Sequence, residues 1–170
     1  ESSEGSVERT DAVILQAGGL RANDKEPEAF VLLVAHRTLL VKEIGDEKAI
    51  PETGDFYFEL GGVYRDWGLY ARALTLYEKA LKIFESSPSR GPFAPCLATT
   101  YNNMGYLLFA QLSEIETEEG EEQGDAPQQD ALRYDKALEY YNHALSIRKK
   151  NEGETHESVA DVYSNIAMVY

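Results

Sequence analysis

Amide and aromatic side chains at helical spacing form the group best suited to recognising another molecule. Asn102, Tyr106 and Phe109 are spaced at i, i+4 and i+7, which places them on one side of a helix. This helix has a separate packing stripe, so a second apolar stripe is not needed for its own folding. An amide donates and accepts hydrogen bonds at once, and an aromatic ring offers an apolar anchor. Such side chains suit binding of an extended segment with apolar anchors.

Residues with catalytic or metal-binding chemistry are sparse. Cys96 is the single cysteine, which excludes an internal disulfide, and no motif marks it as a nucleophile. His36, His143 and His156 do not pair with Cys, Asp or Glu at metal-ligand spacing. The sequence also lacks a calcium-binding loop and a Gly-rich phosphate loop. We therefore expect no enzyme, no cofactor and no metal site.

The helix that carries Asn102 belongs to a segment that recurs along the chain. The first copy has Leu60-Gly61, Tyr64, Ala73, Tyr77 and Ala80-Leu81. The second copy has Met104-Gly105, Leu108, Ala137, Tyr141 and Ala144-Leu145, and a third begins with Ile166-Ala167 and Tyr170. These stripes have helical spacing, and the short Trp67-Gly68-Leu69 segment between two of them allows only a tight turn. The pattern predicts antiparallel helix pairs, with small residues where two helix backbones approach closely.

This arrangement resembles the tetratricopeptide repeat, and within that family the long repeats of kinesin light chains. Residues 101–106 look like the first helix of those repeats and residues 134–141 like the second. The likeness covers roughly residues 55–111 and 131–170. It implies an all-α, right-handed superhelical solenoid of antiparallel helix pairs. The alternative is an unrelated four-helix bundle with similar helices.

The resemblance also implies where a partner would bind, because in this family one face of each first helix lines a concave groove. The partner-binding residues would then be Phe58, Arg65, Asn102, Asn103, Tyr106, Phe109, Asn165 and Met168. Asn103 and Asn165 match the asparagine that binds the peptide backbone in kinesin light chains, whereas the first copy departs from this pattern with Glu59. The alternative for the asparagines is to cap or bridge neighbouring helices. For Tyr106 and Phe109 it is burial under the next helix or under the insertion described below.

Repeat spacing predicts the organisation of the chain. Leu60 and Met104 are 44 residues apart and Met104 and Ile166 are 62 apart, against about 34 in the ordinary repeat. The excess falls in residues 113–130, whose eight acidic and no basic residues predict a disordered acidic insertion. The remaining segments are a flexible tail (1–10), a degenerate helical repeat region (11–54, with helices over 11–22 and 27–42), a first repeat (55–94), a second repeat (95–150) and the first helix of an incomplete third repeat (151–170).

The charge and the apolar runs limit the classes of partner. The net charge is −14, but outside residues 113–130 there are 22 acidic and 16 basic residues, a balance of −6. This acidity disfavours nucleic acid as a partner. The longest apolar run, residues 29–41, is too short for a membrane span and contains His36 and Arg37. A cytoplasmic location is expected, or the interior of an organelle after removal of a targeting segment.

Two functions follow as hypotheses. The first is a protein–protein interaction module or adaptor that binds an extended peptide segment of a partner in its groove. The second is a structural or assembly subunit that is docked permanently in a larger multiprotein complex. The chain begins without an initiator Met and ends within the incomplete third repeat. We therefore expect a fragment or a processed protein, whose exposed C-terminal helix face is covered by further repeats or by another chain.

Overall fold

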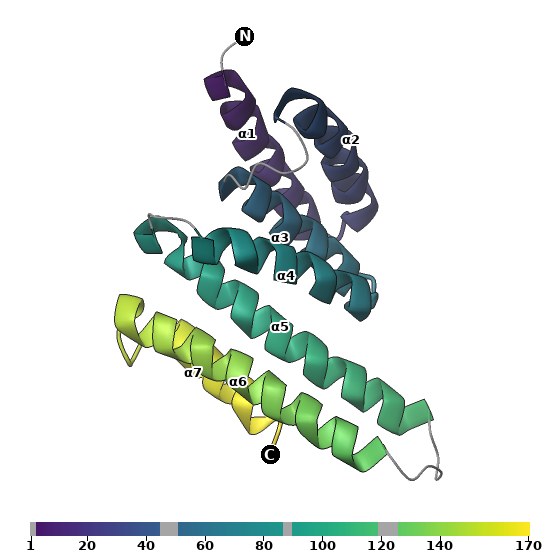
Figure 1. Ribbon diagram of the computed structural model, residues 1–170, viewed down its shortest axis with the longest axis vertical. Coiled ribbons are helices and arrows are strands. Elements are labelled where there is room, and N and C mark those ends of the chain that lie inside the picture. Colours follow the sequence, from purple (N-terminus) through teal and green to yellow (C-terminus); the bar gives the residue numbers. More distant parts are fainter. Residues whose placement is uncertain (1–2, 45–50, 87–89, 119–125) are drawn as a thin grey trace. The chain divides into compact units, whose positions relative to one another are not determined.

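A computed structural model of the chain contains helices and no strand in the residues that it describes, which are 3–44, 51–86, 90–118 and 126–170 (Figure 1). Side chains are described over residues 9–38, 53–86, 95–112 and 130–170. The chain divides into two compact units, residues 1–88 and 89–170. The predicted all-α architecture of paired helices is confirmed, and each unit is described by itself below.

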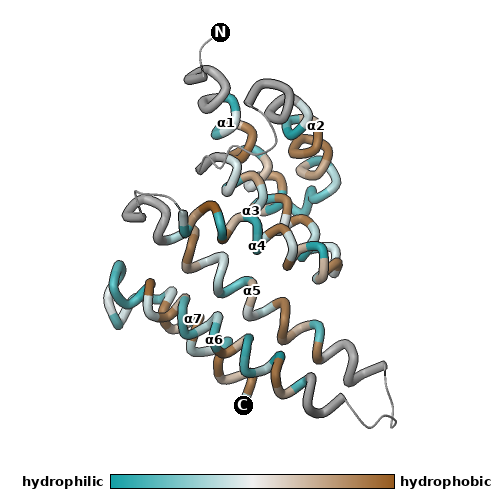
Figure 2. Tube along the Cα trace, viewed as in Figure 1, coloured by the Kyte–Doolittle hydropathy of each residue, from teal (hydrophilic) through white to brown (hydrophobic). Residues whose placement is uncertain are grey.

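Unit 1 contains two helix pairs. Its helices are α1 (Ser3–Arg21), α2 (Glu26–Ile44), α3 (Pro51–Asp66) and α4 (Tyr70–Ser86). Helix α1 packs against α2 and α3, and α3 also packs against α4. Apolar and polar residues are interspersed along these helices, as Figure 2 shows, and α4 has the clearest apolar face, which buries Ala73, Tyr77, Ala80 and Phe84. The buried core consists of Ala17, Ala29, Leu33, Phe56, Leu60 and Val63.

The α3–α4 connection is a tight turn, as its length predicts. Gly68 has a φ of 72°, a left-handed conformation that glycine adopts without steric cost. The Gly68 N–H donates to the Arg65 carbonyl at 2.9 Å, and the Leu69 N–H donates to the Tyr64 carbonyl at 2.8 Å. This pair of bonds closes the end of α3 and reverses the chain into α4.

The N-terminal region differs from the expected tail. Residues 3–10 belong to helix α1. Thr10 is fully buried, and its Oγ1 lies 3.0 Å from Nε2 of the buried His36 on α2. Packing against α2 thus adds a hydrogen bond between buried side chains, which the polar composition of residues 1–10 does not reveal.

Unit 2 contains one long helix pair and a further helix. Its helices are α5 (Arg90–Glu118), α6 (Ala126–Glu152) and α7 (Glu157–Ala167). Helix α6 packs against both α5 and α7. The α5 and α6 helices extend into the expected insertion from both sides, as is compatible with the good helix propensity of glutamate and glutamine. Only residues 119–125 of that segment lie outside the described residues.

The same glycine–tyrosine contact occurs in each unit. A Cβ atom at Gly61 would lie 3.0 Å from Cε1 of Tyr77, and a Cβ atom at Gly105 would lie 2.8 Å from Cε1 of Tyr141. Both tyrosines are fully buried. The spacing that the two sequence copies share therefore reflects one packing rule, in which a glycine leaves room for the tyrosine ring of the paired helix.

Candidate partner-binding surface

Unit 2 brings together predicted residues from two successive repeats. Nδ2 of Asn165 on α7 donates a hydrogen bond of 2.9 Å to Oδ1 of Asn102 on α5, across 63 residues of sequence. This bond matches the expected alternative in which an asparagine bridges neighbouring helices. It uses one donor of Asn165 and the acceptor of Asn102. The NH₂ group of Asn102 and the carbonyl oxygen of Asn165 are left to form other hydrogen bonds.

Exposed apolar side chains occur on the same two helices as this amide pair. Tyr106 follows Asn102 by one turn of α5 and is 39% exposed, and Met168 at the end of α7 is 49% exposed. Phe109 is half-buried, with its ring 6.4 Å from that of Tyr134 between centroids. We define the unit 2 surface as Asn102, Tyr106, Phe109, Asn165 and Met168. Asn103, also predicted to bind a partner, is half-buried.

Tyr141 lies beneath the exposed part of α5. Its side chain is fully buried, and its ring contacts Gly105, the residue before Tyr106. The Tyr141 hydroxyl has no hydrogen-bond partner among the described residues. Burial raises the pKa of Tyr141, and the neighbouring Tyr106 raises it further. The phenol is therefore neutral at physiological pH.

The matched positions of unit 1 are occupied differently. The Phe58 ring lies 5.5 Å from the ring of Tyr77 between centroids, so it is engaged within the unit. Arg65 forms an ion pair of 2.7 Å with Asp66. Glu59, which replaces the asparagine of the other copies, accepts a 2.7 Å hydrogen bond from Nη1 of Arg21.

Arg21 organises this part of unit 1. A Cβ atom at Gly62 would lie within 2.3 Å of the Arg21 guanidinium, so the glycine leaves room for the arginine to cross α3. The guanidinium also pairs with Asp66 at 3.0 Å. Burial alone would lower the pKa of Arg21, but the carboxylates of Glu59 and Asp66 outweigh it and raise that pKa. Arg21 is therefore a permanently charged link between α1 and α3.

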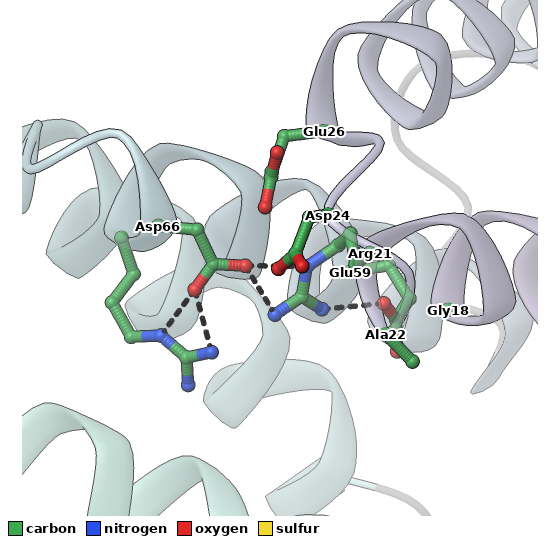
Figure 3. Close-up of a pocket in the computed structure, with 8 residues that line it drawn as sticks. Gly18, Arg21, Ala22, Asp24, Glu26, Glu59 and Asp66 are labelled. Atoms are coloured by element: carbon green, nitrogen blue, oxygen red, sulfur yellow. Dashed lines mark hydrogen bonds and ion pairs between the residues drawn. The ribbon is translucent and has the colours of Figure 1, made fainter.

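A polar hollow of about 590 Å³ surrounds this ion-pair network. Asp24 and Glu26 contribute two more carboxylates to its wall (Figure 3). The sequence shows the departure at Glu59, but it does not show that Arg21 is the counter-ion, because the two residues are 38 positions apart. Gly62, where the second copy has Tyr106, is the sequence signal that a neighbouring side chain crosses there.

The described parts of the chain lack two other kinds of site. Among those residues, no group of three or more His, Cys, Asp and Glu side chains could hold a metal ion. No helix in the same residues is both long enough and apolar enough to cross a membrane.

Comparison with known proteins identifies the repeat. Models of the tetratricopeptide repeat match residues 54–87, in unit 1, and residues 129–170, in unit 2. A search of curated proteins found no match.

Several solved structures are similar to the chain. BtubC (BKLC) from P. vanneervenii is 19% identical with a TM-score of 0.54, and the alignment covers 100% of this chain and 66% of that one. Two structures of a Podosopora anserina putative kinesin light chain with nearly identical TPR-like repeats are each 19% identical, with TM-scores of 0.48 and 0.47. Those alignments cover 100% and 96% of this chain and 88% and 86% of the others. The repeat matches agree with the helix pairs described above: the chain contains tetratricopeptide repeats over residues 54–87 and 129–170.

Proposed function

We propose that the unit 2 surface binds an extended segment of a partner protein. Tetratricopeptide repeats act in general as protein–protein interaction modules, in which stacked helix pairs present an extended surface. The observation that carries the proposal is the bond between Asn102 and Asn165. It aligns amide groups from two repeats beside the exposed Tyr106, so that polar and apolar contacts are available together.

The composition of this surface favours one kind of segment. An extended backbone has alternating N–H and C=O groups, and the remaining donor of Asn102 and acceptor of Asn165 can pair with one of each. Tyr106 and Met168 are the exposed apolar members and suit apolar side chains of the partner. The surface contains no Lys or Arg, so a C-terminal carboxylate would be poorly neutralised. An internal segment with apolar anchors is the favoured ligand.

The other predicted contacts have a smaller part in this proposal. Phe58, Asn103 and Arg65 remain predictions as partner-binding residues. Phe58 and Arg65 already have ring or ion-pair partners within unit 1. A partner that used them would have to add to those contacts or replace them. We therefore assign the principal contacts to unit 2.

A selected peptide provides the test. Linear peptides are chosen from a displayed random library on the full chain, and their affinity is measured by fluorescence polarisation. Tyr106→Ala and Asn165→Ala should each weaken binding about tenfold, which corresponds to roughly 1.4 kcal/mol. Arg72→Ala, an exposed substitution on α4, is the control and should leave the affinity unchanged. If neither unit 2 variant weakens binding while both remain folded, the proposed surface is wrong.

A permanently docked structural subunit is the second candidate. It is favoured by exposed apolar residues in the first helix pair, where Leu15 is 80% and Val31 is 66% exposed. Sedimentation of the purified chain tests it. A docked subunit should self-associate or aggregate when alone, and Leu15→Ser with Val31→Ser should restore a monomer. A wild-type chain that sediments as a monomer at high concentration would contradict this candidate.

A further inference from the structure

We propose that the Tyr141 hydroxyl is a concealed hydrogen-bond donor of the unit 2 surface, and that a partner segment reaches it when the Tyr106 side chain changes rotamer and packs against that segment. The acceptor would be a backbone carbonyl of the partner. This inference rests on the proposed function, because it adds a residue to the same surface. It assigns a binding role to a side chain that is fully buried in the free protein.

The first observation is the unpaired hydroxyl itself. Among the described residues, Tyr141 Oη is the buried side-chain polar atom that lacks a hydrogen-bond partner. Such atoms are rare because a buried polar group loses its bonds to water. A phenylalanine would fill the same ring position without this penalty. A tyrosine at this position is accounted for if its hydroxyl, which has no hydrogen-bond partner in the free protein, donates a hydrogen bond in a complex.

The second observation is the position of the ring. Tyr141 is on α6, the helix that packs against both α5 and α7, and these two helices are joined by the bond between Asn102 and Asn165. The Tyr141 ring contacts Gly105, which is adjacent to the exposed Tyr106. Tyr141 therefore approaches the unit 2 surface from below, next to the residue proposed to bind the partner.

The third observation is that the neighbouring side chain can move. Tyr106 is 39% exposed, and an exposed side chain changes rotamer rapidly. A Cβ atom at Gly105, the residue before Tyr106, would lie 3.0 Å from Cζ of Tyr141, the atom that bears the hydroxyl. Movement of the Tyr106 side chain would open access to the hydroxyl without any change in the helix packing.

Unit 1 shows what happens without such a neighbour. Tyr77 holds the matched position, but it is not left without a partner, and its ring also lies against Phe58. The position that matches Tyr106 is Gly62, which has no side chain and is crossed by Arg21. The unpaired phenol beneath a movable aromatic residue is thus a feature of unit 2, where the surface carries amide and aromatic groups.

The test is the removal of one oxygen atom. Tyr141→Phe is prepared in the full chain, and its affinity is measured for a linear peptide selected on the wild-type protein from a displayed random library. We expect about five- to tenfold weaker binding, the loss of one hydrogen bond. We also expect an unchanged or higher midpoint of thermal unfolding, because the free protein loses an unsatisfied group. Tyr77→Phe is the matched control and should leave the peptide affinity unchanged.

Weaker peptide binding with an unchanged or higher unfolding midpoint supports the inference, and three results would overturn it. If Tyr141→Phe lowers both the affinity and the unfolding midpoint, the hydroxyl is already bonded in the free protein and its role is structural. If the affinity is unchanged while Tyr106→Ala and Asn165→Ala weaken binding, the surface stands but Tyr141 is not part of it. If none of the three variants weakens binding, the proposed function fails and this inference fails with it.

Discussion

The two units share the packing of one helix pair, α3–α4 in unit 1 and α5–α6 in unit 2. They differ in the surface residues of the first helix of that pair. In unit 1 these positions include Glu59 and Gly62, and an arginine from the preceding helix pair lies over them. In unit 2 the matched positions are Asn103 and Tyr106, and the nearby amide of Asn102 accepts a hydrogen bond from Asn165 on α7. The position at which Arg21 crosses α3 in unit 1, Gly62, thus carries the exposed aromatic ring of Tyr106 in unit 2.

This difference separates the residues that hold the repeat together from those that vary on its surface. The contact between a glycine and a tyrosine ring is present in both units, because the backbones of the paired helices must approach closely. The surface positions have no such constraint. Charge pairing satisfies them in unit 1, whereas unit 2 keeps hydrogen-bonding capacity and apolar area exposed. A surface that is already paired internally is a poor binding site, and this is why unit 2 is the stronger candidate.

The largest expected effect comes from breaking the ion-pair network of unit 1. Arg21→Met removes the partner of Glu59 and Asp66, whose side chains are only 16% and 22% exposed. We expect a loss of about 2 kcal/mol in the free energy of unfolding, because the poorly hydrated Glu59 carboxylate is left unpaired and Asp66 keeps only its ion pair with Arg65. Trp67, the single tryptophan, lies in unit 1 and reports this change through its fluorescence in a urea titration.

Two further variants sharpen that measurement. Arg72→Met removes an exposed arginine that lies 5.8 Å above the Tyr64 ring, and it should cost less than about 0.5 kcal/mol. Adding Glu59→Gln to Arg21→Met should recover part of the loss, because the unpaired charge of Glu59 disappears. A loss that is equal for Arg21→Met and Arg72→Met would show that the network does not stabilise unit 1.

The second prediction tests the shared glycine–tyrosine contact. Gly105→Ala places a Cβ atom 2.8 Å from the buried Tyr141 ring, whereas Gly61→Ala places one 3.0 Å from Tyr77. We expect Gly105→Ala to cost about 1–2 kcal/mol after the gain in helix propensity, and Gly61→Ala to cost less. Amide hydrogen exchange in α5 and α6 for the first variant, and in α3 and α4 for the second, measures the loss.

Gly19→Ala is the control for helix propensity, since no other group lies within 4 Å of the added atom. It should stabilise α1 by about 0.5–1 kcal/mol. Equal stabilisation by all three alanines would show that the rings yield without cost, and the common packing rule would then be wrong.

The third prediction concerns the stability of unit 2 at alkaline pH. The pKa of Tyr141 is raised above its ordinary value of 10.0, chiefly by burial. The stability from keeping this phenol neutral is therefore complete below pH 10.0 and is lost as the pH rises towards the folded-state pKa, by at most about 1.4 kcal/mol per pH unit.

Urea unfolding of the wild type and of Tyr141→Phe between about pH 9 and pH 11 measures this contribution. The loss of stability with rising pH should be smaller in the variant, and the difference should appear in amide exchange of unit 2. Identical pH dependence of the two proteins would mean that Tyr141 ionises as easily when folded as when unfolded.

The smallest effect is expected for the amide pair. Asn102→Ala and Asn165→Ala each remove the 2.9 Å bond between α5 and α7. A double-mutant cycle should give a coupling free energy of about 0.5–1 kcal/mol, as for a neutral hydrogen bond that is partly exposed. Amide exchange in α7 is the measurement. Strictly additive effects would show that the two amides act separately, and the alignment on which the proposed binding surface depends would be lost.

The sequence by itself was sufficient for the repeat architecture. Glycine, alanine and tyrosine recur at fixed helical spacing, and a fixed packing geometry between helices admits few residue types at those positions, so the pattern is visible without coordinates. The same spacing placed Asn102, Tyr106 and Phe109 on one helix. The extent of the first and fifth helices was less clear, because polar residues such as Thr10 and the glutamates after Gln111 are compatible with helix or with loop.

Only the tertiary structure decided which side chains meet across repeats. Arg21 reaches Glu59, Asn165 reaches Asn102, and Tyr141 is left with an unpaired hydroxyl. Sequence periodicity gives the direction of a side chain around its own helix axis. A contact between helices depends in addition on how far one helix is shifted and rotated against the next, and those quantities are set by the packing of the whole unit.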